Sequence, residues 1–289
     1  MLTVKAALEE LMASMDRVDA QVILSHVLGV NRAWIAANPM RILTETEDAK
    51  IDVLAAQRAM GQPVAYLLAK REFYGREFEV TPAVLIPRPE TETLIEAALA
   101  RLDSSIPSTV LRNHEASILE LGTGSGAIAV TLAAERPEAS IVATDASDAA
   151  LQVARRNAVR HGCAERIDFA LGSWYEPVAG RRFDLIVSNP PYVAARDPHL
   201  ARGDLRFEPP QALTDGSADG LGSIGAIVAG APRHLLPGGW LLLEHGYDQA
   251  AALSKLLEAA RFEERVCLED LAGIPRVAGG KISPTRRST

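Results

Sequence analysis

The chain contains 289 residues, of which 48% are hydrophobic and 23% are charged, and its formal net charge is −7. This composition is typical of a globular protein, and no apolar run approaches the roughly 18 residues that a membrane-spanning helix needs. The acidic balance also argues against a protein that wraps nucleic acid, where a basic face is expected, although a local basic patch would be compatible with it.

Metal binding and secretion are not expected. The two cysteines, Cys163 and Cys267, are too few for a disulfide framework or a zinc site, and the histidines form no H-x-x-x-H pair. The N-terminus, MLTVKAALEEL, carries acidic residues early and lacks the basic and apolar regions of a signal peptide. We therefore expect a cytoplasmic protein with no membrane association and no metal.

Residues 1–71 are predicted to form a small helical bundle that is separate from the rest of the chain. Apolar residues recur at helical spacing, and Gly29 and Gly61 are typical helix stops. No pattern in the first 65 residues indicates a β-strand. The expected helical segments are 4–15, 19–29, 31–39 and 47–63.

Residues 72–87 are predicted to be a linker. In the stretch EFYGREFEVTPAVLI, apolar and polar residues alternate around Gly75, which indicates a hairpin or two short strands. A helix is expected to follow, because Pro89 suits a first helical position and Glu90 suits the positive end of the helix dipole.

From Ser117 onward, predicted strands and helices alternate. The expected strands are 117–121, 140–145, 167–172, 183–188, 239–246, 264–270 and 275–281, and the expected helices are 126–135, 147–162, 225–236 and 248–262. This alternation predicts an α/β, Rossmann-like fold with a mostly parallel sheet over residues 88–282, and ligands bind such sheets beyond the C-terminal strand ends. Residues 283–289 are polar and basic, and we expect a disordered tail.

A glycine-rich loop connects the first strand and helix of this region, in the stretch ILELGTGSGAIAV. Glycine permits a tight turn and close approach of a ligand, and the helix N-terminus offers free N–H groups. The spacing fits two ligands. With Ala129 in the last position it matches the G-x-G-x-x-A of a dinucleotide site, whereas Glu120, two residues before Gly122, suits the ammonium group of S-adenosylmethionine.

Two further residues suit the adenosine part of either ligand. Asp145 ends the second strand, where a carboxylate can accept hydrogen bonds from both ribose hydroxyls. Its alternative role, as the N-cap of the next helix, can be filled by Ser147. Trp174 follows the third strand and could stack on the base, although a plain core tryptophan is a fair alternative.

The fourth strand is followed by Asn189, Pro190, Pro191 and Tyr192. The prolines end the strand and stiffen the turn. Because the fourth strand is expected beside the first, Asn189 should lie near the reactive end of the cofactor. Its side-chain oxygen and the Pro190 carbonyl can accept both hydrogens of a planar amino group, and Tyr192 offers a face for that group. Catalysis would then be mainly alignment.

Asn-Pro-Pro-Tyr after a strand resembles the amino-methyltransferase motif, which occurs in enzymes that methylate adenine or cytosine amino groups and in enzymes that methylate glutamine side chains. Further segments resemble the peptide chain release factor N5-glutamine methyltransferases, and the likeness covers nearly the whole chain. These segments are residues 61–80, 85–96, 189–213, 238–249 and 270–280. One departure is Ala69, where relatives often have glycine, and it concerns the geometry of the linker and not the chemistry.

The resemblance implies a class I methyltransferase that methylates the glutamine in the Gly-Gly-Gln loop of peptide chain release factors and so modulates translation termination. It implies S-adenosylmethionine as cofactor, with S-adenosylhomocysteine as product. We also expect a monomer that does not bind nucleic acid directly, and, if a release factor is the substrate, an N-terminal bundle that helps to dock it. The implied cofactor-binding residues are Gly122, Thr123, Gly124, Ser125, Gly126, Asp145, Trp174 and Asn189. Glutamine binding is implied at Asn189, Pro190, Pro191 and Tyr192, with catalysis assigned to Asn189, Pro190 and Tyr192.

Other functions fit the residues less well. A nucleic-acid amino-methyltransferase would need a basic groove and a target-recognition domain, and a nicotinamide oxidoreductase or an adenosine-binding regulatory module leaves Asn189–Tyr192 without a purpose. A glutamine methyltransferase acting on a ribosomal protein is disfavoured only by the whole-chain resemblance. Glu208 and Pro209 could border the substrate loop or form a structural turn, and they are not assigned.

Overall fold

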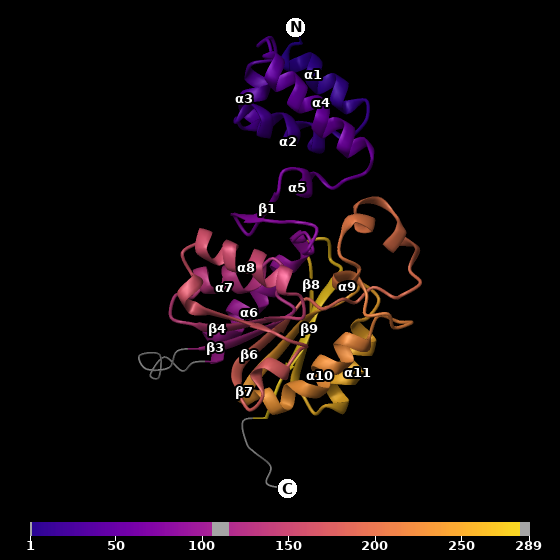
Figure 1. The fold of residues 1–289 in the computed structure, drawn as a ribbon. Coiled ribbons are helices and arrows are strands. Elements are labelled where there is room, and N and C mark those ends of the chain that lie inside the picture. Colours follow the sequence, from indigo (N-terminus) through magenta and orange to yellow (C-terminus); the bar gives the residue numbers. More distant parts are fainter. Residues whose placement is uncertain (1, 106–115, 284–289) are drawn as a thin grey trace. The chain divides into compact units, whose positions relative to one another are not determined.

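The computed structural model describes residues 2–105 and 116–283, and the chain forms two compact units (Figure 1). The helical unit comprises Met1–Lys70 together with Ala201–Phe207. The sheet unit comprises Arg71–Leu200 and Glu208–Thr289. Of the tail expected at 283–289, residues 284–289 lie outside the described residues.

The helical unit contains the four helices that the sequence predicts and one short addition. Polar side chains cap the first four helices at Thr3, Asp16, Asn31 and Thr44, and Gly29 ends the second helix in the left-handed conformation. Buried aliphatic side chains, among them Ile23 and Leu24, form the core between them. The helices are α1 (Val4–Met12), α2 (Arg17–Leu28), α3 (Arg32–Ala37), α4 (Glu45–Ala59) and α5 (Val64–Leu67).

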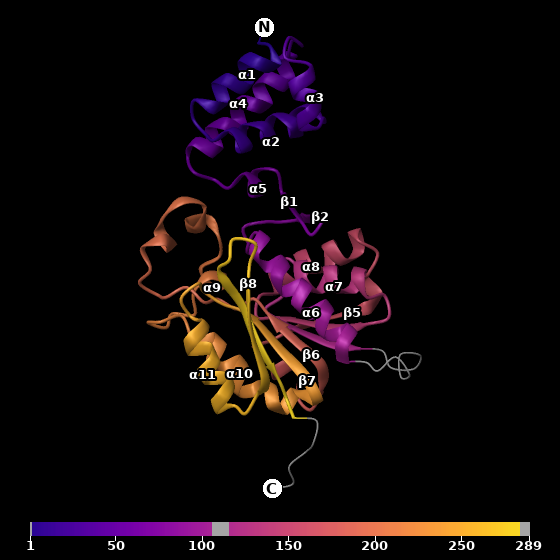
Figure 2. The same ribbon diagram turned by 180° about the vertical axis from the view of Figure 1, so that it is seen from behind.

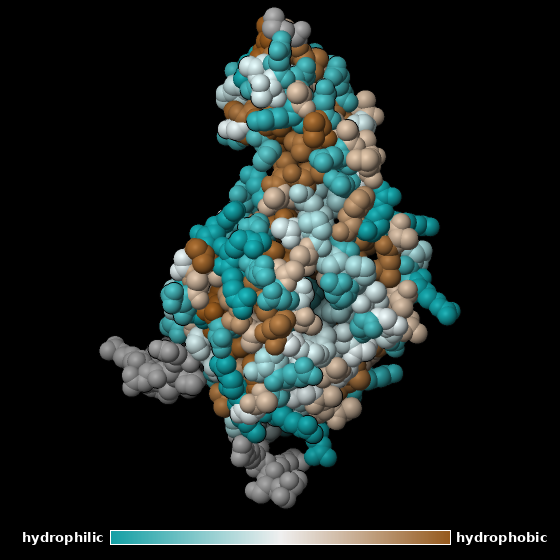
Figure 3. Space-filling model, viewed as in Figure 1, coloured by the Kyte–Doolittle hydropathy of each residue, from teal (hydrophilic) through white to brown (hydrophobic). Residues whose placement is uncertain are grey.

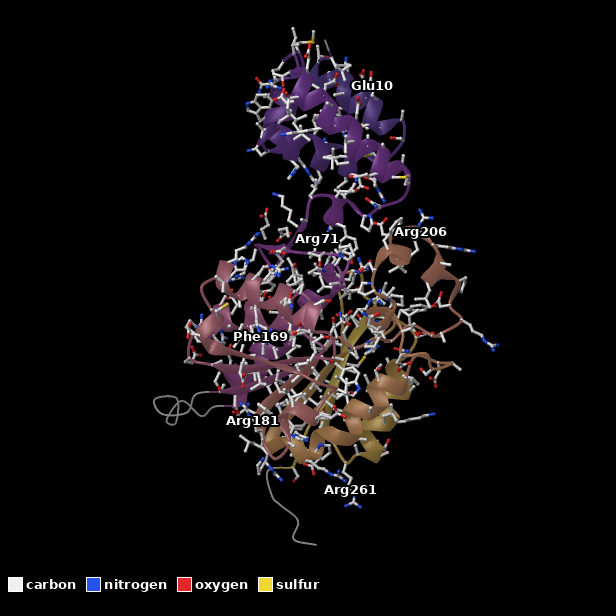
Figure 4. The ribbon with its side chains drawn as sticks, viewed as in Figure 1. Glu10, Arg71, Phe169, Arg181, Arg206 and Arg261 are labelled. Atoms are coloured by element: carbon white, nitrogen blue, oxygen red, sulfur yellow. The ribbon has the colours of Figure 1, made fainter. Side chains whose placement is uncertain are left out.

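Residues 201–207 belong to the helical unit although they are far from it in the sequence. Arg58 donates hydrogen bonds to Asp19 and to Asp204, each at 2.8 Å. Arg206, labelled in Figure 4, donates to the carbonyl oxygen of Met60 at 2.8 Å. These polar contacts hold residues 201–207 against α4 and the residue that follows it.

The surface of the helical unit is mixed. In the view of Figure 3, apolar patches interrupt its polar surface. Exposed large apolar side chains of this unit are Met12, Val18, Met40, Ile42, Val53 and Met60.

The sheet unit is built on a seven-stranded sheet with the order β5-β4-β3-β6-β7-β9-β8. Strands β5, β4, β3, β6 and β7 are parallel, and β9 is antiparallel to both β7 and β8. The strands are β3 (Ser117–Leu121), β4 (Ser140–Asp145), β5 (Ile167–Leu171), β6 (Phe183–Ser188), β7 (Leu235–Glu244), β8 (Glu263–Glu269) and β9 (Pro275–Lys281). The predicted Rossmann-like fold and its mostly parallel sheet are confirmed.

Helices cover both faces of this sheet, as Figures 1 and 2 show from opposite sides. Helices α6 (Glu92–Ser105), α7 (Ala127–Glu135) and α8 (Asp148–Arg160) pack on one face, and α10 (Gly222–His234) and α11 (Ala250–Ala259) pack on the other. Two buried apolar clusters, one on each face, fix the sheet between these layers. Shorter elements are η1 (Pro89–Thr91), η2 (Ala164–Arg166), η3 (Glu176–Val178), η4 (Pro198–Ala201), η5 (Gly203–Phe207) and α9 (Pro210–Leu213).

A two-stranded hairpin, β1 (Lys70–Phe73) and β2 (Arg76–Glu79), stands where the sequence predicts one. Ala69 precedes it with a φ of 53°, in the left-handed region that glycine adopts more readily. This conformation is more costly for alanine than for glycine, so the departure noted at Ala69 concerns backbone geometry.

Asn157 of α8 fastens β2 to the glycine-rich loop. This fully buried side chain donates to the carbonyl oxygens of Glu79 and Ser125 and accepts from the Glu79 N–H, at 2.7 to 2.9 Å. Both amide hydrogens and the amide oxygen of Asn157 are therefore engaged within the protein.

Within the described residues, no helix is long and apolar enough to cross a membrane.

We expect Asn157→Ala to lower the free energy of unfolding by about 2–4 kcal/mol, because it leaves buried backbone groups without partners. Urea denaturation followed by circular dichroism measures the change. Gln152→Ala, at an exposed position of the same helix, is the control and should stay within about 0.5 kcal/mol of the wild type. Equal stability of the two variants would contradict this role of Asn157.

Candidate active site

A pocket of about 660 Å³ opens at the carboxyl ends of β3, β4 and β6. This is the edge at which parallel sheets of this kind bind ligands, and the volume suits a nucleotide-sized molecule. The pocket walls include most of the residues that the sequence singles out. These are Glu120, Gly122, Thr123, Gly124, Ser125, Asp145, Trp174, Asn189 and Pro191.

Three predicted site residues do not line this pocket. Gly126 has a φ of 80°, and a Cβ added there would lie 3.0 Å from the Cβ of Ala154, so it allows α7 to begin close to α8. Pro190 is buried. The ring of Tyr192 packs against the apolar cluster on the face of the sheet that α10 and α11 cover.

Glu120 is a buried acid at the floor of the pocket. Its Oε2 accepts from the Thr123 hydroxyl at 2.6 Å and from the Ala129 N–H at 3.0 Å, in the first turn of α7. Its Oε1 is also buried but has no partner in the described residues. Burial raises the pKa of Glu120 to about 8, and the nearby Asp145 adds to the rise. An unpaired carboxylate oxygen in a pocket fits a cationic ligand group such as an ammonium.

Asp145, the last residue of β4, lines the pocket beside the glycine-rich loop. Its two carboxylate oxygens accept from the N–H groups of Gly124 and Ser147, each at 2.8 Å. Burial raises its pKa while these backbone hydrogen bonds oppose the rise. Ser147 caps α8, as the sequence predicts, so Asp145 is not needed as the cap. Each oxygen retains a lone pair, which leaves the carboxylate able to accept from ligand hydroxyls.

Trp174 closes one side of the pocket. It has a φ of 43°, a conformation that is rare for a bulky residue, and the Thr144 hydroxyl donates to its carbonyl oxygen at 3.3 Å. Its side chain also packs against the buried cluster on the α10 and α11 face. Trp174 therefore contacts the core and lines the pocket at once, and its stacking on a base stays a prediction.

Asn189 stands at the end of β6, directly beside β3. Its side-chain nitrogen donates to the Thr91 hydroxyl at 3.1 Å, and that hydroxyl donates to Glu244 at 2.6 Å. Tyr192 donates to the other oxygen of Glu244 at 3.1 Å. The side chain of Asn189 makes no other hydrogen bond within the described residues, so its oxygen is available to a ligand.

Residues that the sequence left unassigned or did not single out also lie at or near the pocket. Glu208 is buried, pairs with Arg88, and accepts from the Ile86 N–H at 3.0 Å, so it fixes the chain that precedes η1. Pro209 and Thr91 line the pocket itself. The sequence allows Glu208 and Pro209 to border the substrate loop, whereas no local pattern indicates that Thr91 lies near Asn189. In the described parts of the chain, no cluster of three or more His, Cys, Asp or Glu side chains could hold a metal ion.

Comparison with known proteins identifies relatives along nearly the whole chain. The family described as PrmC N-terminal domain matches residues 3–68, and the family described as Methyltransferase small domain matches residues 101–205. The release factor glutamine methyltransferase of Xylella fastidiosa is 49% identical over 266 residues, which are 92% of this chain and 93% of that protein. That of Burkholderia pseudomallei is 49% identical over 96% of both chains.

The chain belongs to the release factor glutamine methyltransferase family. This membership confirms the resemblance and the enzyme class that the sequence predicts. Solved structures agree with the fold. A Pyrococcus furiosus methyltransferase is 18% identical, covers 79% of this chain and 97% of its own, and has a TM-score of 0.51. A T. thermophilus 16S rRNA methyltransferase in complex with AdoMet and guanosine is 22% identical, covers 74% and 49%, and has a TM-score of 0.52.

Because Oε1 of Glu120 is unpaired in the pocket, we expect Glu120→Gln to weaken S-adenosylmethionine binding about 10-fold to 100-fold, since a charged acceptor suited to an ammonium group would be replaced by a neutral amide. Isothermal titration calorimetry at pH 7, where the amino group of S-adenosylmethionine is an ammonium, measures the difference. An unchanged dissociation constant would mean that the unpaired oxygen does not meet the ligand.

Proposed function

We propose that this protein transfers a methyl group from S-adenosylmethionine to the side-chain amide nitrogen of the glutamine in the Gly-Gly-Gln loop of peptide chain release factors, and thereby modulates translation termination. The observation that carries the proposal is the oriented side chain of Asn189. Its nitrogen is bound to Thr91, and its free oxygen belongs to the same pocket as Glu120 and Asp145.

The cofactor would be held by residues along the ends of β3 and β4. We assign its ammonium group to the unpaired oxygen of Glu120 and its ribose hydroxyls to Asp145. Trp174 would border the adenine, and Asn189 would border the reacting end. The backbone of the loop from Gly122 through Thr123, Gly124 and Ser125 to Gly126 would cradle the amino-acid part.

The glutamine side chain would enter beside Asn189. The Asn189 oxygen and the Pro190 carbonyl would each accept one amide hydrogen, while Pro191 and Tyr192 complete the loop that receives the group. When bound, S-adenosylmethionine supplies a methyl group on a sulfonium, and its transfer to the amide nitrogen leaves S-adenosylhomocysteine and a proton. The residues of this chain therefore act mainly by alignment, and no strong base is needed.

The substrate assignment rests on what the relatives are named for, and the relatives match both units. We propose that the helical unit helps to dock the release factor, and its exposed apolar side chains are suited to a protein partner. We further propose a monomer that acts in the cytoplasm, where translation takes place, and that does not bind nucleic acid directly. The net charge of −7 favours the last point.

Replacing Asn189 with Ala should abolish methyl transfer while leaving the fold intact, because the side chain sits at the pocket and not in the core. Circular dichroism and cofactor binding check the fold, and incorporation of labelled methyl groups checks the activity. Near-normal methylation by this variant would overturn the mechanism.

The proposed function is tested by methyl transfer from labelled S-adenosylmethionine to three purified acceptors. These are a release factor, the same factor with its loop glutamine replaced, and duplex DNA. Label on the intact release factor alone is the expected result. Label on DNA would assign the protein to the base-methylating class. No label on any of the three acceptors, with cofactor binding retained, would point to another protein substrate such as a ribosomal protein.

A further inference from the structure

Glu244 is a buried carboxylate that the mechanism above leaves without a role. It ends β7 and follows Leu243, which pairs with Ser188, so the parallel register brings it alongside Asn189. Its side chain is 1% exposed, and both oxygens are engaged, one by Thr91 and one by Tyr192. A buried acid that contacts both the Asn-Pro-Pro-Tyr loop and η1 is placed to control that loop.

The chemistry of the three groups gives the hydrogen-bond chain a direction. An ionised carboxylate only accepts, so Thr91 must donate its single hydroxyl proton to Glu244. The Thr91 oxygen can then only accept, so it is the nitrogen of the Asn189 amide that must face it. The Asn189 oxygen is thereby turned away from Thr91 and toward the pocket.

We propose that Glu244 is a positioning residue whose carboxylate sets the direction of the Glu244–Thr91–Asn189 chain and so presents the Asn189 oxygen to the target amide. This inference rests on the proposed function, which assigns that oxygen to the glutamine hydrogens. Through its second oxygen, Glu244 also fixes the hydroxyl of Tyr192 and with it the far end of the loop.

The state of Glu244 responds to pH in the neutral range. Burial raises its pKa to about 7, against the lowering effects of Thr91, Tyr192 and Arg276 of β9, while Glu90 of η1 adds a small rise. Below that pH the neutral carboxyl can donate to Thr91, and Thr91 can then donate to Asn189. The Asn189 side-chain amide can rotate by about 180° in response. Its own N–H groups would then face the N–H groups of the target amide, and the two cannot hydrogen-bond.

The first variant is Glu244→Gln, which keeps the shape but lacks an obligatory acceptor. At pH 8 and saturating cofactor, kcat should fall about 10-fold to 100-fold, as for a misaligned reactant, with cofactor affinity little changed. The wild-type kcat should fall as the pH drops through about 7, and this acid limb should be absent from the variant. Asp184→Asn is the control, since Asp184 bonds Ser117 at the opposite end of β6, and it should keep the acid limb.

A second pair of variants separates direction from stability. Thr91→Val removes the relay and should lower kcat like Glu244→Gln, whereas Thr91→Ser retains a hydroxyl and should restore most of the rate and the acid limb. A residue that only supported the fold would instead change the thermal stability of each variant without altering the pH profile.

A readout without turnover is the NMR signal of the Asn189 side-chain amide, identified by its loss in Asn189→Ala. It should titrate near pH 7 in the wild type, in Asp184→Asn and in Glu120→Gln, and it should not titrate in Glu244→Gln. A signal indifferent to pH, or a Glu244→Gln variant with wild-type kcat and acid limb, overturns the inference. A wild type that methylates no release factor overturns the proposed function instead, and the titration still decides the direction of the chain.

Discussion

The parallel pairing of β3 with β6 and of β6 with β7 is the constraint on which the site depends. Each pairing is in register to the strand end, Leu121 with Ser188 and Ser188 with Leu243. Parallel strands deliver their carboxyl ends to one edge of the sheet, so the residues at and just after those ends lie along that edge. Glu120 near the end of β3, Asn189 just after β6 and Glu244 at the end of β7 share this edge, although they are far apart in the chain.

Both acids at this edge are kept from water by the packing that builds the fold. Apolar side chains on the two faces of the sheet leave Glu120 and Glu244 each 1% exposed, and burial raises the pKa of each, to about 8 and about 7. Burying a carboxylate is unfavourable unless its oxygens are satisfied. Glu244 has partners on both oxygens, whereas one oxygen of Glu120 is left for a ligand. The environment of Glu244 therefore suits a positioning role, and that of Glu120 suits ligand binding.

The segment after the Asn-Pro-Pro-Tyr loop is divided between the two units of the chain. Residues 201–207 join the helical unit, where Asp204 pairs with Arg58. Glu208 and Pro209 return to the sheet unit, where Glu208 holds Arg88 and Pro209 lines the pocket. A single stretch of chain thus contributes to the unit proposed to dock the substrate and to the pocket proposed to modify it.

Local pattern was sufficient to predict most of the fold. Alternating apolar strands and amphipathic helices are periodic over short windows, so the seven strands and the main helices of the sheet unit fall where the sequence predicts them. Short or irregular elements were missed, such as α5, because four residues carry no period. The glycine loop, Asp145 and the loop at Asn189 stand out as candidates in the sequence, because each lies at or directly after the end of a strand, and the end of a strand is visible in the sequence.

The amino-acid sequence by itself determined which residues end the parallel strands and to which family the chain is similar. Only the tertiary structure decided what those residues touch. Thr91 and Glu244 carry no motif, yet they orient Asn189 through bonds that span 98 and 153 residues of sequence separation. The physical reason is that hydrogen bonds and burial depend on distance in space, and strand order and register, which set that distance, arise only when the whole sheet assembles.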